Sequence, residues 1–127
     1  MRRKIAVIGG GLAGSEVAWQ LHRAGVEVTI YEMKPEQYSP AHSNPKLAEL
    51  VCSNSFRSDA LHSGPGLLKS EMRSLESLIM AVAEKVRVPA GKALAVDRDK
   101  FAATVTDCLD QCPKVDIVRR EISSLSD

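Results

Sequence analysis

The amino-acid sequence predicts an α/β fold in which helices flank a parallel β-sheet. Residues 4–8 are β-branched and apolar, as expected of a strand that is buried on both faces of such a sheet. Residues 26–31 alternate and are β-branched, which predicts a second strand. Between them, residues 12–24 place apolar side chains at helical spacing, and Gly25 follows as a helix stop. A strand, a helix and a strand in this order predict a βαβ unit at the start of the chain.

The rest of the chain is expected to resume this alternation after a long interruption. Residues 33–66 contain four prolines and several serines, so we expect an irregular loop, in which residues 47–51 form a helical turn or a short strand. A single helix is expected from about Pro65 to Val86, with its leucines and methionines facing the core. The last expected elements are strands at residues 92–96 and 115–118 and, between them, a helix that Asp97 caps and that runs to about Cys112. We expect all of these elements to form one α/β layered structure that stops early.

Composition and charge argue against several classes of protein. The 127 residues carry 17 basic and 16 acidic side chains, and a net charge of +1 gives no overall footprint for nucleic acid or for a membrane surface. No apolar run approaches membrane-spanning length, so no membrane association is expected.

The three cysteines are too few, and odd in number, for a secreted disulfide framework, so a cytoplasmic protein is expected. Cys108 and Cys112 lie one helical turn apart, but no nearby histidine completes a metal site. We therefore expect both to pack in the core, and we expect no metal.

A glycine motif lies where the first expected strand meets the first expected helix. The spacing Gly9-x-Gly11-x-x-Gly14, with Glu32 about 20 residues further on, is the dinucleotide-binding pattern of Rossmann-like domains. Gly9 allows the tight turn, Gly11 lets the backbone approach a pyrophosphate, and Gly14 lets helix and strand pack closely, while the helix N-terminus offers N–H groups to the phosphates. The candidate cofactor-binding residues are Gly9, Gly10, Gly11, Leu12, Ala13, Gly14, Glu32, Met33 and Lys34.

The Glu32 carboxylate can accept hydrogen bonds from ribose hydroxyls and disfavours a 2′-phosphate. FAD or NAD is therefore expected rather than NADP, and the glycine motif alone does not choose between these two.

Residues 50–59 form a polar segment with one thiol, three hydroxyls and a guanidinium close together. The segment could present Cys52 as a reactive thiolate beside a cation, which would lower the pKa of the thiol. Arg57 could equally bind a phosphate or carboxylate of a ligand. A solvated loop with a half-buried cysteine accounts for the same composition, so the residues alone leave these alternatives open.

Three motifs together resemble one family. V-I-G-G-G-L-A-G-S-E with Y-E-M-K-P, then L-V-C-S-N-S-F-R-S-D, then A-L-A-V-D-R-D-K-F follow the order of the folate- and FAD-dependent tRNA (uracil-5-)-methyltransferases (TrmFO, formerly Gid). The first motif is common among flavoproteins, whereas C-S-N-S-x-R-S-D and A-V-D-R are specific to this family. The GidA/MnmG enzymes, which modify wobble uridines, carry a different cysteine loop that this sequence lacks.

This resemblance implies a reaction. NAD(P)H reduces FAD, 5,10-methylenetetrahydrofolate supplies a methylene carbon, and that carbon becomes the 5-methyl group of a T-loop uridine in tRNA without S-adenosylmethionine. Cys52 matches the motif cysteine and is the candidate for the thiol that adds to C6 of uracil or for an acid or base. A second family cysteine lies beyond this sequence, so the chain does not decide which of the two is the nucleophile. The residues implied in the substrate or folate pocket are Ser53, Asn54, Ser55, Arg57, Asp59 and Arg98.

Members of that family are considerably longer than this chain. We therefore expect residues 1–127 to be the N-terminal portion of an FAD-binding Rossmann-like domain, incomplete and without methyltransferase activity on its own. The sequence leaves the oligomeric state open. Two other interpretations remain, namely a sibling flavoenzyme (of the GidA/MnmG type or a generic FAD/NAD oxidoreductase) and a non-catalytic nucleotide-binding module.

Overall fold

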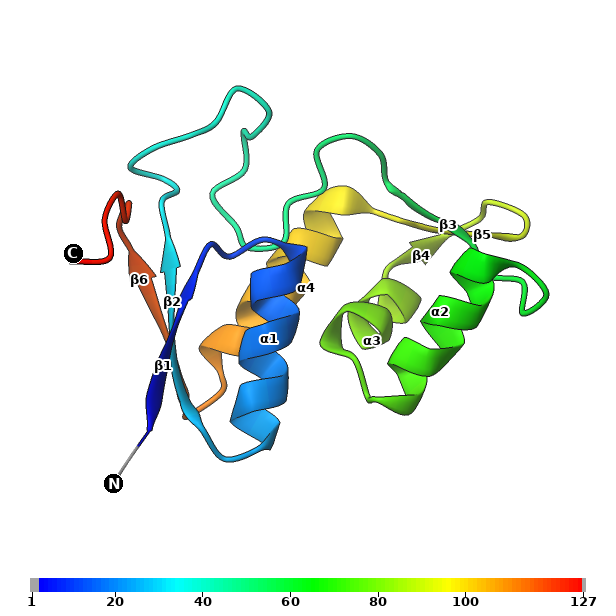
Figure 1. Ribbon diagram of the computed structural model, residues 1–127. Coiled ribbons are helices and arrows are strands. Elements are labelled where there is room, and N and C mark those ends of the chain that lie inside the picture. Colours follow the sequence, from blue (N-terminus) through cyan, green and yellow to red (C-terminus); the bar gives the residue numbers. More distant parts are fainter. Residues whose placement is uncertain (1–2, 127) are drawn as a thin grey trace.

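The computed structural model describes residues 3–126, in which two small sheets lie beside four helices (Figure 1). Strands β1 (Lys4–Ile8), β2 (Glu27–Glu32) and β6 (Val115–Arg119) form a parallel sheet in the order β1-β2-β6. Strands β3 (Ser55–Ser58), β5 (Ala93–Val96) and β4 (Arg87–Val88) form an antiparallel sheet in the order β3-β5-β4. The helices are α1 (Leu12–Arg23), α2 (Gly64–Ser74), α3 (Leu78–Lys85) and α4 (Arg98–Asp110).

The parallel sheet confirms the predicted βαβ unit. β2 lies between its two neighbours, and the side chains of Val28 and Ile30 are completely buried. Helices α1 and α4 lie between this sheet and the rest of the molecule (Figure 1). Because all three strands run in the same direction, Ile8, Glu32 and Arg119 end them at one edge, and the loops that follow meet there.

One expectation about this sheet is wrong. β1 was expected to be buried on both faces, but Ile5 and Ile8 are exposed. β1 lies at the edge of the sheet in the described part of the chain, and α1 covers it from one side only.

The second sheet also corrects the sequence analysis. Residues 92–96 do form a strand, but β5 pairs with β3 and β4 and does not join the parallel sheet, so the chain is not one layered structure. Residues 55–58 were expected to lie in the irregular loop that the prolines and serines of residues 33–66 predicted, yet they pair with β5 across a bulge. Residues 47–51 form neither a helical turn nor a strand.

The single helix expected from Pro65 to Val86 is two helices. The break lies at Glu76, which adopts a left-handed φ of 55°, and the hydroxyl of Ser77 then accepts a hydrogen bond from the Met80 N–H and caps α3. The buried residues of α2 are Gly66 and Lys69. Glycine is needed at position 66, because a Cβ there would lie 1.8 Å from the Ala60 carbonyl oxygen.

The apolar stripe expected across this region is therefore only partly a core. Leu67, Leu68 and Leu75 are more than half exposed, whereas Ile79 and Val82 in α3 are buried. At α4, by contrast, Asp97 accepts a hydrogen bond from the Lys100 N–H, so the predicted cap is confirmed.

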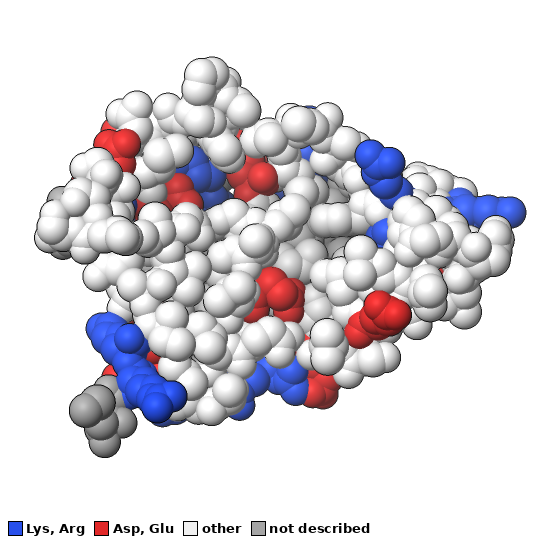
Figure 2. Space-filling model, viewed as in Figure 1, with Lys and Arg blue, Asp and Glu red and all other residues white. Residues whose placement is uncertain are grey.

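The visible surface carries charges of both signs. On the face shown in Figure 2, acidic and basic side chains are interspersed. Within residues 3–126, no helix is both long and apolar enough to cross a membrane.

Candidate functional site

The turn between β1 and α1 has the geometry that the glycine motif predicts. Gly9 adopts a φ of 97° and donates from its N–H to the Tyr31 carbonyl oxygen (2.8 Å). A Cβ on Gly14 would lie 1.9 Å from the Gly9 carbonyl oxygen, so only glycine lets α1 approach the turn this closely. Gly10, an unspecified position in the motif, is confined by side chains, because its Cβ would lie 2.4 Å from a Leu47 methyl group and 3.0 Å from a Glu32 carboxylate oxygen.

Glu32 at the end of β2 is fixed against this turn. Its carboxylate accepts hydrogen bonds from the Gly10 N–H (2.8 Å) and from the Lys34 N–H (3.0 Å), and the residue is 6% exposed. Each carboxylate oxygen has more than one lone pair, so Glu32 keeps the capacity to accept further hydrogen bonds from a ligand.

A pocket of about 310 Å³, which we call the nucleotide pocket, opens beside these residues. It brings together six of the nine predicted cofactor-binding residues from the ends of β1 and β2. Its lining consists of Ile8, Gly9, Gly10, Gly11, Tyr31, Glu32, Met33, Lys34, His42, Glu49, Arg120, Glu121 and Ile122.

The N-terminus of α1 also faces open space. Helix α1 begins after Gly11, which makes no side-chain capping hydrogen bond, and a Cβ on Gly11 would meet no atom within 4 Å. Such a helix start offers backbone N–H groups to a phosphate. Leu12 and Ala13 line a different, apolar cavity on the other side of α1, next to Phe56.

Sequence reasoning missed two contributors to the nucleotide pocket. The Arg120 guanidinium lies 5.5 Å from the centroid of the Tyr31 ring, and His42 approaches from the loop after β2. Arg120 follows β6, and the loops after adjacent parallel strands meet at one edge of a sheet, so the order β1-β2-β6 would have identified it. No local signal marks His42.

Lys34 lines the nucleotide pocket, but its ammonium group points elsewhere. It donates to two backbone carbonyl oxygens and to the Glu49 carboxylate (3.1 Å), and its side chain is 4% exposed. Lys34 and Glu49 thus form a partly buried ion pair beside the glycine turn.

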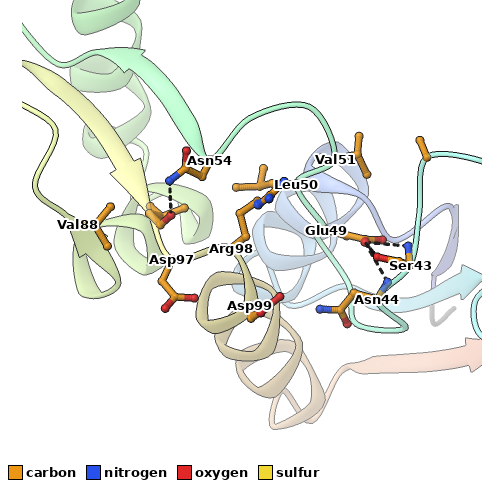
Figure 3. Close-up of a pocket in the computed structure, with 12 residues that line it drawn as sticks. Ser43, Asn44, Glu49, Leu50, Val51, Asn54, Val88, Asp97, Arg98 and Asp99 are labelled. Carbon is orange, nitrogen blue, oxygen red and sulfur yellow. Dashed lines mark hydrogen bonds between the residues drawn. The ribbon is translucent and has the colours of Figure 1, made fainter.

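A larger cavity of about 570 Å³ lies between the loop after β2 and the start of α4 (Figure 3). It brings together two of the residues predicted for a substrate or folate pocket, Asn54 and Arg98. The Asn54 amide donates to the Val96 carbonyl oxygen (3.1 Å), which ties the segment to β5. The remaining lining residues are Ala41, Ser43, Asn44, Glu49, Leu50, Val51, Val88, Val96, Asp97 and Asp99.

The other predicted residues of the 50–59 segment do not line this cavity. Cys52 is a free, exposed thiol. The hydroxyls of Ser53 and Ser55 each accept a hydrogen bond from the N–H two residues later (3.0 Å), and Arg57 is exposed with a left-handed φ of 67°. These contacts shape the loop and leave the Cys52 sulfur accessible.

Asp59 belongs to an ion-pair cluster in the second half of the molecule. Its carboxylate contacts Arg73 (2.8 Å) and Arg87 (3.2 Å). Burial acts to raise the pKa of Asp59, but hydrogen bonds and charges from the two arginines outweigh burial and hold that pKa below its ordinary value.

The remaining cysteines lie on and after α4. The Cys112 thiol is buried and contacts the Cys108 carbonyl oxygen (3.2 Å), and burial raises the pKa of Cys112. Among residues 3–126, no group of three or more His, Cys, Asp or Glu side chains is placed to hold a metal ion.

Comparisons with known proteins agree with this geometry. The methylenetetrahydrofolate–tRNA-(uracil-5-)-methyltransferase TrmFO of Oleidesulfovibrio alaskensis is 61% identical over 96% of this chain and 27% of the relative. The protein of the same name from Moorella thermoacetica is 55% identical over 100% of this chain and 29% of the relative. The chain thus spans little more than a quarter of the length of these relatives.

A solved structure shows the fold of this chain, and a family model shows the family to which it belongs. The structure of GidA from Aquifex aeolicus matches with a TM-score of 0.71 at 14% identity, over 93% of this chain and 19% of that chain, and so shows a shared fold. A model of the family described as glucose inhibited division protein A matches residues 4–127. The chain therefore belongs to the glucose inhibited division protein A family.

Proposed function

We propose that residues 1–127 are the N-terminal portion of an FAD-binding Rossmann-like domain. The nucleotide pocket fits the ADP half of this cofactor, since the confined glycine turn and the uncapped start of α1 leave room for a pyrophosphate. Glu32 is fixed at the pocket and offers its carboxylate to ribose hydroxyls. When bound, FAD would supply the two-electron redox chemistry, with NAD(P)H as the source of the electrons.

We further propose that the whole protein is a methylenetetrahydrofolate–tRNA (uracil-5-)-methyltransferase that forms 5-methyluridine in the T loop of tRNA in the cytoplasm. The observation that carries this proposal is the 61% identity over 96% of the chain to a relative of that name. The C-S-N-S-x-R-S-D segment, which distinguishes this activity from that of the GidA/MnmG enzymes, is present at residues 52–59.

Cys52 is the residue of this chain that we assign to the chemistry. C5 of uracil is a poor nucleophile until a thiolate adds at C6, and the Cys52 thiol is exposed and free. The thiolate would add to C6, and C5 would then attack the methylene carbon as one of its two bonds to nitrogen breaks, with the electron pair going to that nitrogen. Loss of the C5 proton would expel the second nitrogen and leave a methylene group on C5. A hydride would add to that methylene group as the thiolate leaves C6. The electrons that reduce the methylene carbon to a methyl group come from NAD(P)H through FAD.

The larger cavity is the proposed pocket for flavin or folate. Arg98 at the start of α4 places a cation there beside the carboxylates of Glu49, Asp97 and Asp99, and Asn54 is held in place by β5. Ser53 and Ser55 shape the loop that carries Cys52, because each hydroxyl accepts a hydrogen bond from the N–H two residues later. Arg57 and Asp59 do not line this cavity, and Asp59 pairs with Arg73 and Arg87.

The test is transfer of labelled carbon from 5,10-methylenetetrahydrofolate to tRNA. The longest reading frame that contains this chain is incubated with FAD, NADPH and unmodified tRNA, beside the Cys52→Ala variant and a Cys108→Ala control. We expect label at C5 of the T-loop uridine for the unaltered protein and the control, and none for Cys52→Ala.

The failed outcomes separate the other interpretations. FAD binding without label would overturn the methyltransferase proposal in favour of a sibling flavoenzyme. Nucleotide binding without flavin-dependent turnover would favour a non-catalytic module.

A further inference from the structure

Residues 43–49, which we call the clasp, border the nucleotide pocket and are held by one buried lysine. The Lys34 ammonium donates to the carbonyl oxygens of Asn44 (2.7 Å) and Lys46 (2.9 Å) and to the Glu49 carboxylate (3.1 Å). An ammonium group has three donors, so all three are used within the protein. Lys34 therefore has no N–H left for a phosphate while the clasp is in place.

Glu49 is the acidic partner of Lys34 in the ion pair. One of its oxygens accepts from the N–H groups of Ser43 and Asn44 (2.9 Å each), and the other accepts from Lys34. Burial acts to raise the pKa of Glu49, but these backbone hydrogen bonds and Lys34 outweigh it and lower the pKa to about 2. The carboxylate is thus charged at neutral pH, and both charges of the pair are hydrogen-bonded.

The clasp is bonded directly to the glycine turn. The Ala48 N–H donates to the Gly10 carbonyl oxygen (2.8 Å), and the Gly10 N–H donates to Glu32 (2.8 Å). The Leu47 side chain fills the space beside the Gly10 Cα, and Ala48 adopts a left-handed φ of 54°. An alanine adopts a left-handed φ only where its surroundings impose it, so the conformation of Ala48 depends on the other contacts of the clasp. The position of the Gly10 peptide, which is hydrogen-bonded to Ala48, depends on the same contacts.

We propose that Lys34 and Glu49 are positioning residues for the cofactor, whose ion pair sets the affinity of the nucleotide pocket through the clasp and the Gly10 peptide. The inference rests on the proposed function, because it takes the ligand to be the ADP half of FAD. It also gives Lys34 a different role from a direct ionic contact with a pyrophosphate.

The two roles of Lys34 differ in what they require of Glu49. If Lys34 contacted the pyrophosphate, Glu49 would only oppose anion binding, and its neutralisation would tighten binding. If the pair holds the clasp, neutralising Glu49 loosens the Gly10 peptide and weakens binding. The sign of the effect of Glu49→Gln therefore separates the two roles.

The experiment measures the dissociation constants of FAD and ADP for the protein used in the carbon-transfer assay and for its variants. We expect Glu49→Gln and Lys34→Met to weaken the binding of both ligands by roughly 10- to 100-fold, the range known for residues that orient the ligands of a bound metal. The double variant Lys34→Met/Glu49→Met leaves no unpaired buried charge, so it should lose less affinity than Lys34→Met alone.

Lys69 provides a matched control. It is 5% exposed, its ammonium donates to the carbonyl oxygens of Ser58 (3.0 Å) and Pro65 (3.2 Å), and it does not line the nucleotide pocket. Lys69→Met should lower the thermal midpoint and leave the FAD dissociation constant unchanged. If Lys34→Met does not fold, Glu49→Gln alone decides, because the direction of its effect is diagnostic.

A second readout needs no ligand. Amide hydrogen exchange at Gly10 and Ala48 should become faster in Glu49→Gln and stay unchanged in Lys69→Met. Tighter or unchanged FAD binding in Glu49→Gln, with the unaltered protein binding normally, would overturn this inference and leave the proposed function standing. If the unaltered protein bound neither FAD nor ADP, the proposed function and this inference would fail together.

Discussion

Gly14→Ala tests the close approach of α1 to the glycine turn. The new Cβ would lie 1.9 Å from the Gly9 carbonyl oxygen and 3.3 Å from a Val7 methyl group, so α1 must move away from the turn by more than an ångström. The Gly9 carbonyl oxygen belongs to the backbone, so it cannot rotate away as a side chain could. Helix α1 also buries Ala18 completely, so its displacement disturbs the core.

We expect Gly14→Ala to lower the free energy of unfolding by about 3 kcal/mol, the upper part of the usual range for overpacking. For a chain of this size, that loss lowers the thermal midpoint by roughly 10 °C. Urea and thermal denaturation, followed by circular dichroism, measure both quantities.

Gly64→Ala is the matched control, because Gly64 begins α2 and a Cβ there meets no atom within 4 Å. That variant should be neutral or more stable by up to about 1 kcal/mol. A Gly14→Ala protein as stable as the Gly64→Ala control would refute the close-packing argument.

Three further predictions follow from the site. Gly11→Ala should leave the thermal midpoint nearly unchanged, because its Cβ meets open space. It should weaken FAD binding measured by titration, because that space is where we propose that the pyrophosphate binds, and unchanged affinity would place the phosphates elsewhere. The pKa of Glu49 falls from 4.5 to about 2 on folding, so its contribution of up to about 3 kcal/mol is full above pH 4.5 and is lost as the pH falls through 2. Urea denaturation should therefore show a large difference between the unaltered protein and Glu49→Gln at pH 7, and a difference that does not shrink near pH 2 would contradict this. In the native chain a thiol reagent should modify Cys52 rapidly and Cys112 slowly, since Cys112 is buried and its pKa is raised; mass spectrometry of the labelled peptides tells them apart.

The failures of sequence reasoning in the fold have a common physical cause. Leucine spacing predicted a buried stripe across α2, but the face of α2 that packs is chosen by Gly66 and by the hydrogen bonds of Lys69. Likewise the break at Glu76 depends on α1, because Glu16 accepts hydrogen bonds from the N–H groups of Leu78 and Ile79 and so fixes where α3 begins. Periodicity within a segment carries no information about such partners.

Some features of the candidate site could likewise be predicted from the sequence, and others could not. The motif identified the glycines and Glu32 because a turn and the strand end next to it are encoded within one βαβ unit. The residue types identified the cysteine segment. They did not predict that Asn54 lines the larger cavity while Arg57 and Asp59 lie outside it, because that separation depends on the pairing of β3 with β5.

The sequence by itself determined the βαβ unit, the tight glycine turn and the carboxylate that closes it, because short-range sterics and backbone hydrogen bonding specify these features. Only the tertiary structure decided that Lys34 turns its charge inward to Glu49 and that Arg120 completes the nucleotide pocket. These arrangements depend on contacts such as the Leu47 N–H with Thr106 and the Arg119 guanidinium with the Lys34 carbonyl, which join residues 59 and 85 positions apart. These polar groups need hydrogen-bond partners because folding removes them from water, and no local sequence pattern specifies which partners they find.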